Sequence, residues 1–467
     1  PPRGWDISRH RFRPSCTCCW DVASSARMAP RSPLAAPLLG ASEGQLSGIG
    51  FTAAVLSLVK GCIGAGVMAL PWATIQGGAA SAPALILLGA WNGYTGWLLL
   101  DCDAPGSYSD LVRLALGRGG VVLLEGSLLV VLFGVCVSFQ VQAATLLSSL
   151  PSLGRLASHD VYALITGAAL LPLVLQRSFS GIAAISIAAL AVLCLGLTAV
   201  GLWGLWAEGA PTLPPQLLEP PTAHGFADFL GVAAFSFGGQ VFVLPVRDAM
   251  ARPRLAATAV GVSTAAILAV YAAVGAGGAS LFWRAGVKQL VLLNIEPGSP
   301  CASLVYSCSA AVALLSVPLV FVPLVGIASG LLPAPSEPRL SALAPSPQPQ
   351  PMQPWRREAP LRALLLLLTS AAAAATRDFG LLTGILGCLA NLSALLLPPL
   401  IHLRLRGRRP ASAARPAAVR TALAATDALL LLAGFASCAG PALLIVQQLA
   451  RRAGEEGPEG LPPALGE

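Results

Sequence analysis

Charged residues are scarce in this chain of 467 residues, where Asp, Glu, Lys and Arg together make up 11%. An ordinary soluble domain carries about 25% charged residues. So few charges could not cover the surface of a soluble protein of this size, which excludes a cytosolic globular enzyme, a disordered chain and a secreted disulfide scaffold. Apolar residues make up 55%, and the mean hydropathy is +0.74. These values predict an all-α polytopic membrane protein.

Motifs of several other function classes are also missing. We find no basic face interleaved with aromatic residues, so we expect no nucleic-acid partner and assign the net charge of +8 to cytoplasmic loops. The eleven cysteines show no paired CxxC spacing, so we predict no metal site and no cofactor. HExxH and GxSxG are absent, and Asp427 alone in the last apolar run does not suffice for intramembrane catalysis. We therefore do not expect an enzyme.

Long apolar runs, by contrast, are plentiful. A run of about 20 apolar residues suffices to cross a bilayer, and a helix satisfies its backbone polar groups there. We predict eleven transmembrane helices, at 51–76, 82–100, 120–150, 160–176, 181–206, 226–246, 256–283, 302–332, 361–376, 379–403 and 422–450.

The distribution of Lys and Arg predicts how these helices are oriented, because cytoplasmic loops are enriched in both. With a cytoplasmic N-terminus, the cytoplasmic segments carry 22 of these residues and the opposite segments carry 6. The basic run from Arg404 to Arg409 is the strongest anchor. We therefore expect the N-terminus in the cytoplasm and the C-terminus on the external or luminal side.

The two ends of the chain are expected to lie outside the helical core. Residues 1–47 are predicted to be an unstructured cytoplasmic tail. Residue 1 is Pro and the first methionine is Met28, so we interpret residues 1–27 as a fragment end or a mistaken gene model. Residues 405–467 are expected to hold a basic loop, the eleventh helix and an external tail.

The first and sixth helices carry glycine clusters at corresponding places. Gly64 lies seven residues before Pro71, and Gly238 lies seven residues before Pro245. Gly weakens a helix by about 1 kcal/mol and Pro removes a backbone donor. We interpret both as interrupted helices, a pattern typical of a transporter binding site. The alternative is that the small residues serve close helix packing.

The spacing of the two clusters divides the core into halves. They are five helices apart, so the halves enter the membrane from opposite sides and form an inverted 5+5 repeat. We assign the halves to residues 48–206 and 225–404, with the Pro-rich segment 333–360 as a flexible cytoplasmic loop in the second half. The eleventh helix is an addition to this repeat.

Interrupted helices suit a particular kind of ligand. The half-helix after a break presents free N–H groups and a positive dipole end to a carboxylate. The unwound carbonyl groups can accept hydrogen bonds from an ammonium group. An α-amino acid carries both groups, whereas a sugar would require amide, carboxylate and aromatic side chains. The breaks therefore favour a zwitterion.

Two stretches resemble the signatures of the amino acid/auxin permease family: LVKGCIGAGVMALPWA at 58–73 and AFSFGGQVFVLPVRDAM at 234–250. Weaker similarity covers 107–117, 133–139 and 379–405. The resemblance implies a LeuT-like fold of eleven helices, with broken helices 1 and 6 and one helix beyond the 5+5 repeat. It also implies secondary transport of amino acids driven by protons or sodium.

Lys60 makes the chain look closest to the proton-coupled amino acid transporter branch, because sodium-coupled members tend to have Asn there. A fixed ammonium could take the place of sodium; the alternative is a structural Lys that reaches toward the cytoplasm. Ser316-Val-Pro318 resembles an element beside the family's ion site, although a Ser can also bond its own helix. Gly238 stands where proton-coupled members often have Glu. Glu125 is then the remaining acidic residue deep in the predicted core that could carry the proton. The identity of the driving ion therefore stays open.

The predicted pocket lies between helices 1 and 6, with contributions from helices 3 and 8. Gln140, Gln142 and Gln240 are polar candidates, each of which could instead join helices. Phe139 falls where many family members have Tyr. The predicted ion-coupling residues are Lys60 and Ser316. The predicted substrate-binding residues are Cys62, Ile63, Gly64, Ala65, Gly66, Phe139, Ser236, Phe237, Gly238, Gly239 and Gln240.

Together these features predict a proton-coupled symporter of small neutral amino acids that works by alternating access. Its partners would be an amino acid, H⁺ or Na⁺, and the lipid bilayer of the plasma membrane or of a vacuole or lysosome. Two alternatives stay open. One is an amino-acid sensor with a transporter fold and little flux, and the other is a sodium-coupled amino acid transporter.

Overall fold

The computed structural model describes residues 48–102, 107–175, 182–331, 354–406 and 416–455, and these residues are almost entirely helical. The predicted tail 1–47, which includes residues 1–27, lies outside the described residues, as do most of the loop 333–360 and the last residues of the chain.

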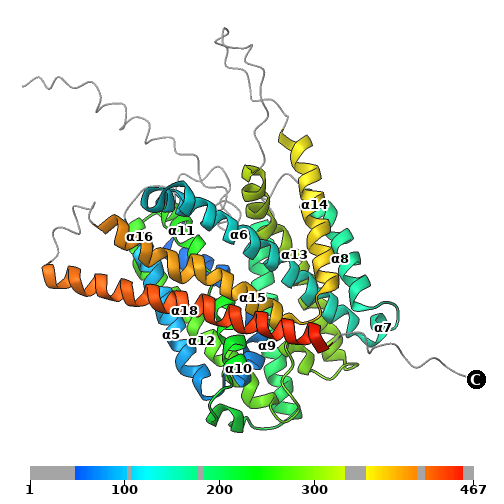
Figure 1. Cartoon of the computed structure of the whole chain (residues 1–467). Coiled ribbons are helices and arrows are strands. Elements are labelled where there is room, and N and C mark those ends of the chain that lie inside the picture. The colour runs from blue at the N-terminus through cyan, green and yellow to red at the C-terminus, as the bar shows by residue number, and fades with distance from the viewer. Residues whose placement is uncertain (1–47, 103–106, 176–181, 332–353, 407–415, 456–467) are drawn as a thin grey trace, which may run out of the picture.

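Helices occupy all eleven predicted places (Figure 1). Three of the places hold two consecutive helices. The helices are α3 (Phe51–Cys62) followed by α4 (Leu70–Gln76), α5 (Ser81–Asp101), α6 (Tyr108–Ser148), α8 (His159–Val174), α9 (Ile182–Ala207), α10 (Ala223–Ser236) followed by α11 (Val243–Ala249), α12 (Ala256–Phe282), α13 (Pro300–Leu331), α14 (Pro354–Ala375), α15 (Phe379–Asn391) followed by α16 (Leu397–Leu405), and α18 (Ala417–Glu455).

Most of these helices are long and apolar enough to cross a membrane. Among the described residues eight meet both criteria, or nine if the bent pair α3 and α4 is one span. Of the other two predicted places, α8 has only 16 residues, and α5 is long enough but carries Asn92, Tyr94 and Thr95 in its middle. The protein is thus a polytopic all-α membrane protein. Eleven crossings and the inverted repeat stay predictions.

Two helix boundaries differ from the prediction. Helix α6 begins at Tyr108 rather than residue 120, because Ser107 and Asp110 form a reciprocal N-terminal cap. Its opening turns are set off by a kink at Gly117, whose φ of 71° favours glycine. Helix α14 begins at Pro354, so residues 354–360 are helical and the prediction that the flexible loop extends to residue 360 is wrong.

The helices differ in how deeply they lie in the bundle. The span that joins α10 and α11 is well enclosed, with 72% of its apolar stretch buried. It packs against α15, α4 and α18. Only 11% of the apolar stretch of α18 is buried. This helix runs along the outside of the bundle across α15 and α16 (Figure 1). The second interrupted helix therefore lies in the interior, as does η1 (Ala65–Ala69), the segment that follows the first interruption.

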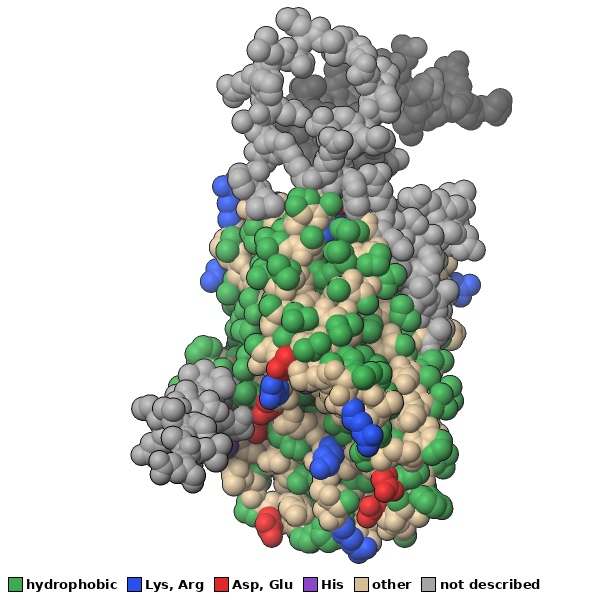
Figure 2. Space-filling view, turned by 90° about the vertical axis from the view of Figure 1, so that its right-hand side faces the viewer, with side chains coloured by type: hydrophobic (Ala, Val, Ile, Leu, Met, Phe, Trp, Pro, Cys, Tyr) green, Lys and Arg blue, Asp and Glu red, His purple; other side chains and the backbone are tan. Residues whose placement is uncertain are grey.

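The outer surface suits contact with lipid. Figure 2 shows a face that is mostly hydrophobic and uncharged over its upper part, with most of its charged side chains in the lower half. Large apolar side chains such as Leu195 and Leu432 are exposed by 68% and 71%. Exposed apolar surface on this scale marks a membrane or protein interface.

Candidate functional site

The first predicted interruption is present at Ile63 and Gly64. Helix α3 ends at Cys62, Ile63 is extended, and the chain resumes as the 3₁₀ helix η1 (Ala65–Ala69), which leads into α4. The two pieces are bent by 55°. Pro71 lies in the first turn of α4, where a missing N–H costs little. The prediction of a broken first helix is confirmed.

The second predicted interruption lies at residues 237–239. Helix α10 ends at Ser236, and the 3₁₀ helix η4 (Gln240–Phe242) leads into α11. The N–H of Gly239 donates to the carbonyl of Phe237 at 2.6 Å, so a tight turn replaces helical hydrogen bonds. The sixth helix is therefore interrupted as predicted, although both pieces still form one apolar span.

The two interruptions pack directly against each other. A Cβ atom on Gly66 would lie 2.5 Å from the Ser236 hydroxyl oxygen, and one on Gly239 would lie closer still to the Cys62 sulfur. Both distances are shorter than real Cβ contacts. At Gly66 a Cβ would also lie 3.2 Å from the Ser236 Cα, so glycine there lets the two backbones approach, whereas at Gly239 only the Cys62 side chain would have to move.

Tyr271 of α12 joins the two interruptions. Its hydroxyl lies 2.9 Å from the carbonyl oxygen of Cys62 and 2.6 Å from that of Ser236, which are the ends of α3 and α10. The side chain is completely buried. The sequence reasoning missed this residue, although a single Tyr in an Ala- and Gly-rich helix was an available signal.

Helix α5 anchors the second interruption. The side-chain amide of Asn92 donates to the carbonyl of Phe237 at 2.7 Å. Gln240 in turn donates to the Asn92 carbonyl and to the Thr95 hydroxyl, at 3.3 and 3.2 Å. The Asn92 bond satisfies a carbonyl group that the break frees, as a nonaqueous environment requires, and the Gln240 bonds join η4 to α5. Asn92 and Thr95 were also missed, and their position in the middle of an apolar run was the signal.

Some polar groups at the interruptions remain open. Among the described residues, no side chain caps η1, whose first N–H groups have no partner within the helix. The side-chain oxygen of Gln240, a residue only 2% exposed, also accepts no hydrogen bond there. The nearest atom to a Cβ on Gly64 would be Phe139 Cζ at 3.8 Å, so a methyl group would fit there in ordinary contact with that ring. This arrangement can present donors to a carboxylate and an acceptor to an ammonium group.

The other predicted polar residues of α6 lie in different surroundings. Gln140 donates to Thr369 at 3.0 Å and accepts from Ser370 at 2.8 Å, so it joins α6 to α14. The side-chain oxygen of Gln142 is buried and has no hydrogen-bond partner among the described residues. Glu125 is half-buried. Of the two amides, Gln142 retains an acceptor that a ligand could use.

The two predicted ion-coupling residues are not joined to each other. The Ser316 hydroxyl donates to the Val312 carbonyl at 2.8 Å, within its own helix. Lys60 lies half-buried in the last turn of α3 and forms no ion pair within the described part of the chain. A Cβ on the adjacent Gly61 would touch the Phe242 ring at 2.5 Å, so the turn of α3 that contains Lys60 packs against η4 through Gly61. Their roles in ion coupling stay predictions.

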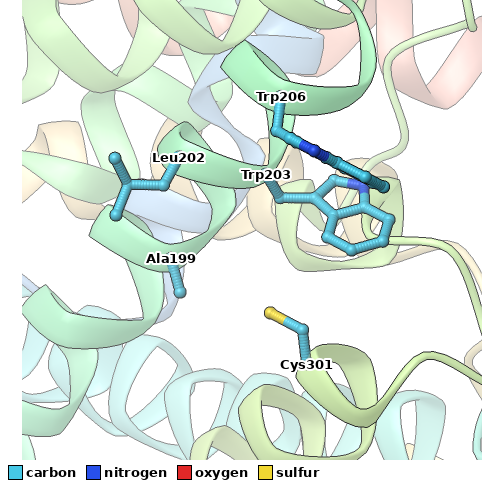
Figure 3. A pocket seen from close by; sticks show the side chains of 5 residues that line it. All are labelled: Ala199, Leu202, Trp203, Trp206 and Cys301. Atoms are coloured by element: carbon cyan, nitrogen blue, oxygen red, sulfur yellow. The ribbon is translucent and has the colours of Figure 1, made fainter.

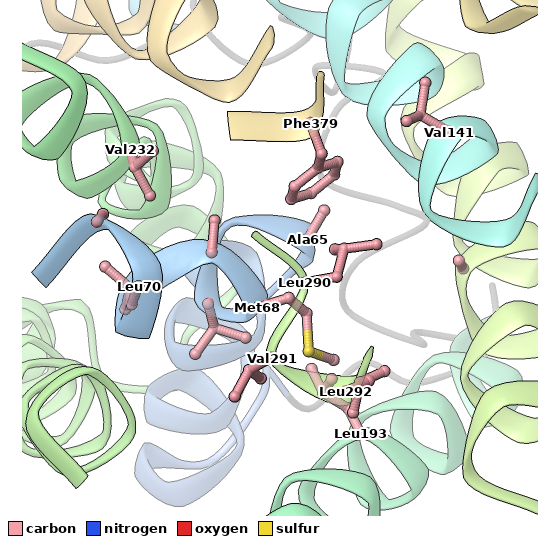
Figure 4. Packing of buried hydrophobic residues seen from close by; sticks show 14 of the residues in the cluster. Ala65, Met68, Leu70, Val141, Leu193, Val232, Leu290, Val291, Leu292 and Phe379 are labelled. Atoms are coloured by element: carbon pink, nitrogen blue, oxygen red, sulfur yellow. The ribbon is translucent and has the colours of Figure 1, made fainter. Parts of the chain in front are cut away.

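The half-helix after the first break is covered by apolar residues. Figure 4 shows Met68 of η1 against Leu290, Val291 and Leu292, with Phe379 close to Ala65. Leu292 belongs to the short helix η6 (Val291–Asn294) in the connection between α12 and α13. This connection therefore closes one end of the interrupted region.

A groove of about 360 Å³ lies elsewhere, between α9 and the start of α13 (Figure 3). Its lining residues are Ala199, Leu202, Trp203, Trp206 and Cys301. The two indole rings lie 5.1 Å apart, and aromatic side chains near a helix end are typical of a membrane interface. The groove shares no residue with the predicted substrate site.

Comparison with known proteins places the chain among transporters. A family model described as transmembrane amino acid transporter protein matches residues 47–440. The chain is 26% identical over 281 residues to vacuolar amino acid transporter 3 of Schizosaccharomyces pombe, covering 59% of this chain and 42% of that protein. It is 27% identical over 289 residues to amino acid transporter AVT1B of Arabidopsis thaliana, covering 58% and 51%. The chain thus spans about half the length, or less, of these two relatives.

A third relative matches over a longer region. Sodium-coupled neutral amino acid transporter 7 of Xenopus laevis is 26% identical over 413 residues, which cover 83% of this chain and 88% of that protein. Among solved structures, the manganese transporter of Eremococcus coleocola covers 88% of this chain, and the match covers 96% of that structure, with 13% identity and a TM-score of 0.49.

Proposed function

The chain belongs to the transmembrane amino acid transporter family, and from this premise we propose that it is a secondary active transporter of small neutral amino acids, coupled to protons. The observation that carries the proposal is the meeting of two interrupted helices, joined by Tyr271, in the interior of the bundle. Such a site between the halves of a repeat can be opened to either side by moving one group of helices against another. Alternating access is the mechanism that follows.

The groups at the interruptions support a neutral amino acid as substrate. The free N–H groups at the start of η1 suit the carboxylate, and the Gln240 oxygen suits the ammonium group. None of the predicted substrate-binding residues is acidic, so none would select a cationic side chain. Phe139 limits the space beside Gly64, which favours a small side chain. The names of the relatives point in the same direction, since all three denote amino acid transporters and one denotes neutral substrates.

Protons are proposed as the driving ion because Lys60 stands beside the first interruption. A fixed ammonium there would repel a sodium ion and could occupy its place. Sodium is the second candidate, because the relative that covers 83% of this chain is named as sodium-coupled. Ser316 is a candidate ligand only in that second case, since its hydroxyl oxygen can still accept while it donates to Val312.

We also propose that the N-terminus is cytoplasmic and that the C-terminus is external or luminal. The excess of Lys and Arg on the segments assigned to the cytoplasm supports this orientation. The membrane is proposed to be the plasma membrane or that of a vacuole or lysosome, and the name of the Schizosaccharomyces pombe relative favours the vacuole.

The test is uptake of labelled Ala, Pro and Gly into liposomes that contain the purified protein. It is run with an imposed pH gradient, with a sodium gradient and with neither. We expect accumulation with the pH gradient alone. Accumulation driven only by a sodium gradient would support the transport function but contradict proton coupling and the role of Lys60. No uptake by folded, inserted protein would contradict the proposal and favour a sensor.

A further inference from the structure

Four polar side chains from three helices meet away from the interruptions, and we call them the His402 cluster. His402 of α16 lies between two carboxylates: Nδ1 is 2.5 Å from Asp427 of α18, and Nε2 is 3.3 Å from Asp101 at the end of α5. Tyr94 of α5 donates its hydroxyl to the second oxygen of Asp427 at 3.1 Å. The cluster therefore joins α5, α16 and α18 through one imidazole ring.

The geometry of the cluster accommodates a dissociable proton. A neutral imidazole has one N–H donor and one lone pair, so it can donate to only one carboxylate. Both nitrogens face carboxylate oxygens here, and both contacts are attractive only when the ring is an imidazolium or when one carboxylate is protonated. In either form the cluster holds one proton more than a neutral ring and two carboxylates.

Burial makes that proton necessary in this arrangement. Asp427 is 0% exposed and His402 is 3% exposed. A buried carboxylate without a cation or a proton is strongly unfavourable. Asp101 is 17% exposed, so it forms the side of the cluster through which a proton can reach the medium. The Nδ1–H therefore stays on the inner side, where it donates to Asp427, and the proton on Nε2 exchanges through Asp101.

The neighbouring helices add few other ionisable groups to the cluster. Cys102 follows Asp101 directly after the end of α5, and α6 contributes Tyr108, whose hydroxyl donates to the Ser393 carbonyl at 2.6 Å. On α16 itself, Arg404 is exposed and Arg406 is half-buried. The segment η7 (Leu392–Leu396) contains no ionisable residue. Asp101 makes a further interaction besides its contact with His402.

The cluster is connected to the second interruption by two routes. Helix α5 carries Asn92, which binds the Phe237 carbonyl, and Asp101 lies nine residues later, about 14 Å along a helix. Helix α16 continues from η7, a π-helical turn that packs against η4. Turns of this kind frequently occur at functional sites. A change at His402 therefore acts on helices that hold the second break in place.

We propose that His402, between Asp427 and Asp101, is the proton-binding site that couples proton movement to substrate movement; this rests on the proposed function. With the proton bound, His402 donates to both carboxylates. On release, Nε2–H passes its proton to Asp101 and then to the medium, and Nδ1–H still donates to Asp427. The Nε2 lone pair then faces a carboxylate, and this repulsion separates α5 from α16. Because Asn92 of α5 holds the Phe237 carbonyl, the separation alters the second break.

The test compares wild type with His402→Gln in liposomes, in two assays. The first is accumulation of substrate driven by one pH unit, for which one proton per substrate gives about tenfold, equal to about 1.4 kcal/mol. The second is exchange of labelled for unlabelled substrate with no gradient. We expect His402→Gln to exchange normally but to accumulate substrate no more than to equal concentrations. His224→Gln is the matched control, because it removes a His of α10 that lies outside the cluster, and it should accumulate like wild type.

The outcomes separate this proposal from the proposed function. Wild type that is not driven by pH would contradict the proposed coupling itself. If the pH gradient drives accumulation in wild type and the His402→Gln variant still accumulates substrate tenfold, only the role of His402 is overturned. Loss of exchange in the folded variant would also overturn it, because His402 would then serve the whole cycle. If His402→Gln does not fold, Asp101→Asn at the more exposed side is judged by the same criteria.

Discussion

Gly64 and Gly66 stand two residues apart in the first break but meet different surroundings. A methyl group on Gly66 would lie 2.5 Å from the Ser236 hydroxyl and 3.2 Å from its Cα, whereas one on Gly64 would meet nothing closer than Phe139 Cζ at 3.8 Å. The first glycine therefore leaves space at the proposed substrate site, and the second allows the two breaks to touch.

This difference predicts opposite effects of the same substitution. Gly66→Ala should destabilise the fold by about 1–3 kcal/mol, because it overpacks the contact between the breaks. Gly64→Ala should leave thermal unfolding in detergent unchanged and should weaken substrate uptake, because its methyl group occupies space assigned to the substrate. Equal loss of stability in the two variants, or normal uptake by Gly64→Ala, would place the substrate elsewhere.

At the scale of single elements, Tyr271 is the contact that fixes α3 and α10 relative to each other. Tyr271→Phe removes the donor shared by the Cys62 and Ser236 carbonyls, and a lost buried hydrogen bond costs about 1 kcal/mol. The matched control is Tyr306→Phe. Its hydroxyl is also buried and donates to the Ile295 carbonyl at 2.8 Å, away from the breaks.

We expect similar losses of thermal stability in these two variants but a change in substrate affinity only in Tyr271→Phe. Affinity is measured as the concentration that half-saturates exchange. A lower affinity in both variants would indicate a general loss of stability, and an unchanged affinity in both would remove Tyr271 from the site.

Helix positions and both interruptions could be predicted from the sequence, whereas the partners of each helix could not. Length and apolarity determine where a helix can cross, and the Gly clusters before Leu-Pro determine where two of them break. These spans are apolar on most sides, so no polar stripe indicates which neighbour each face meets. The contacts of Asn92, Tyr271 and His402 join residues far apart in sequence, and they became visible only once the helices were placed.

Across the whole molecule, a backbone bridge connects the segments next to the two interrupted helices. The N–H of Ile49 donates to the Ala249 carbonyl at 2.8 Å, and the N–H of Ala251 donates to the Ile49 carbonyl at 3.0 Å. Ile49 precedes α3 and Ala251 follows α11. In the proposed orientation this bridge lies on the cytoplasmic side, and the connection that contains η6 covers the opposite end.

Gly48→Ala should open the cytoplasmic side, because its methyl group would lie 2.5 Å from the backbone nitrogen of Ala251. Gly50→Ala is the matched control, since nothing lies within 4 Å of a Cβ there. The measurement is modification of the Cys62 thiol by an impermeant reagent added from the cytoplasmic side, followed by mass spectrometry. Faster modification is expected only for Gly48→Ala, and equal rates in the two variants would contradict a closing role for the bridge.

The same bridge has a consequence for the order in which a bound amino acid would leave. Because the bridge is built from main-chain groups, a change of side-chain rotamer cannot release it. Helices α3 and α11 would therefore move together as one rigid unit. Opening toward the cytoplasm would then withdraw both half-sites together, the η1 N–H groups that follow α3 from the carboxylate and the Gln240 oxygen that precedes α11 from the ammonium group. The zwitterion would be released in a single step, with no intermediate in which one of its charges stays bound while the other is free.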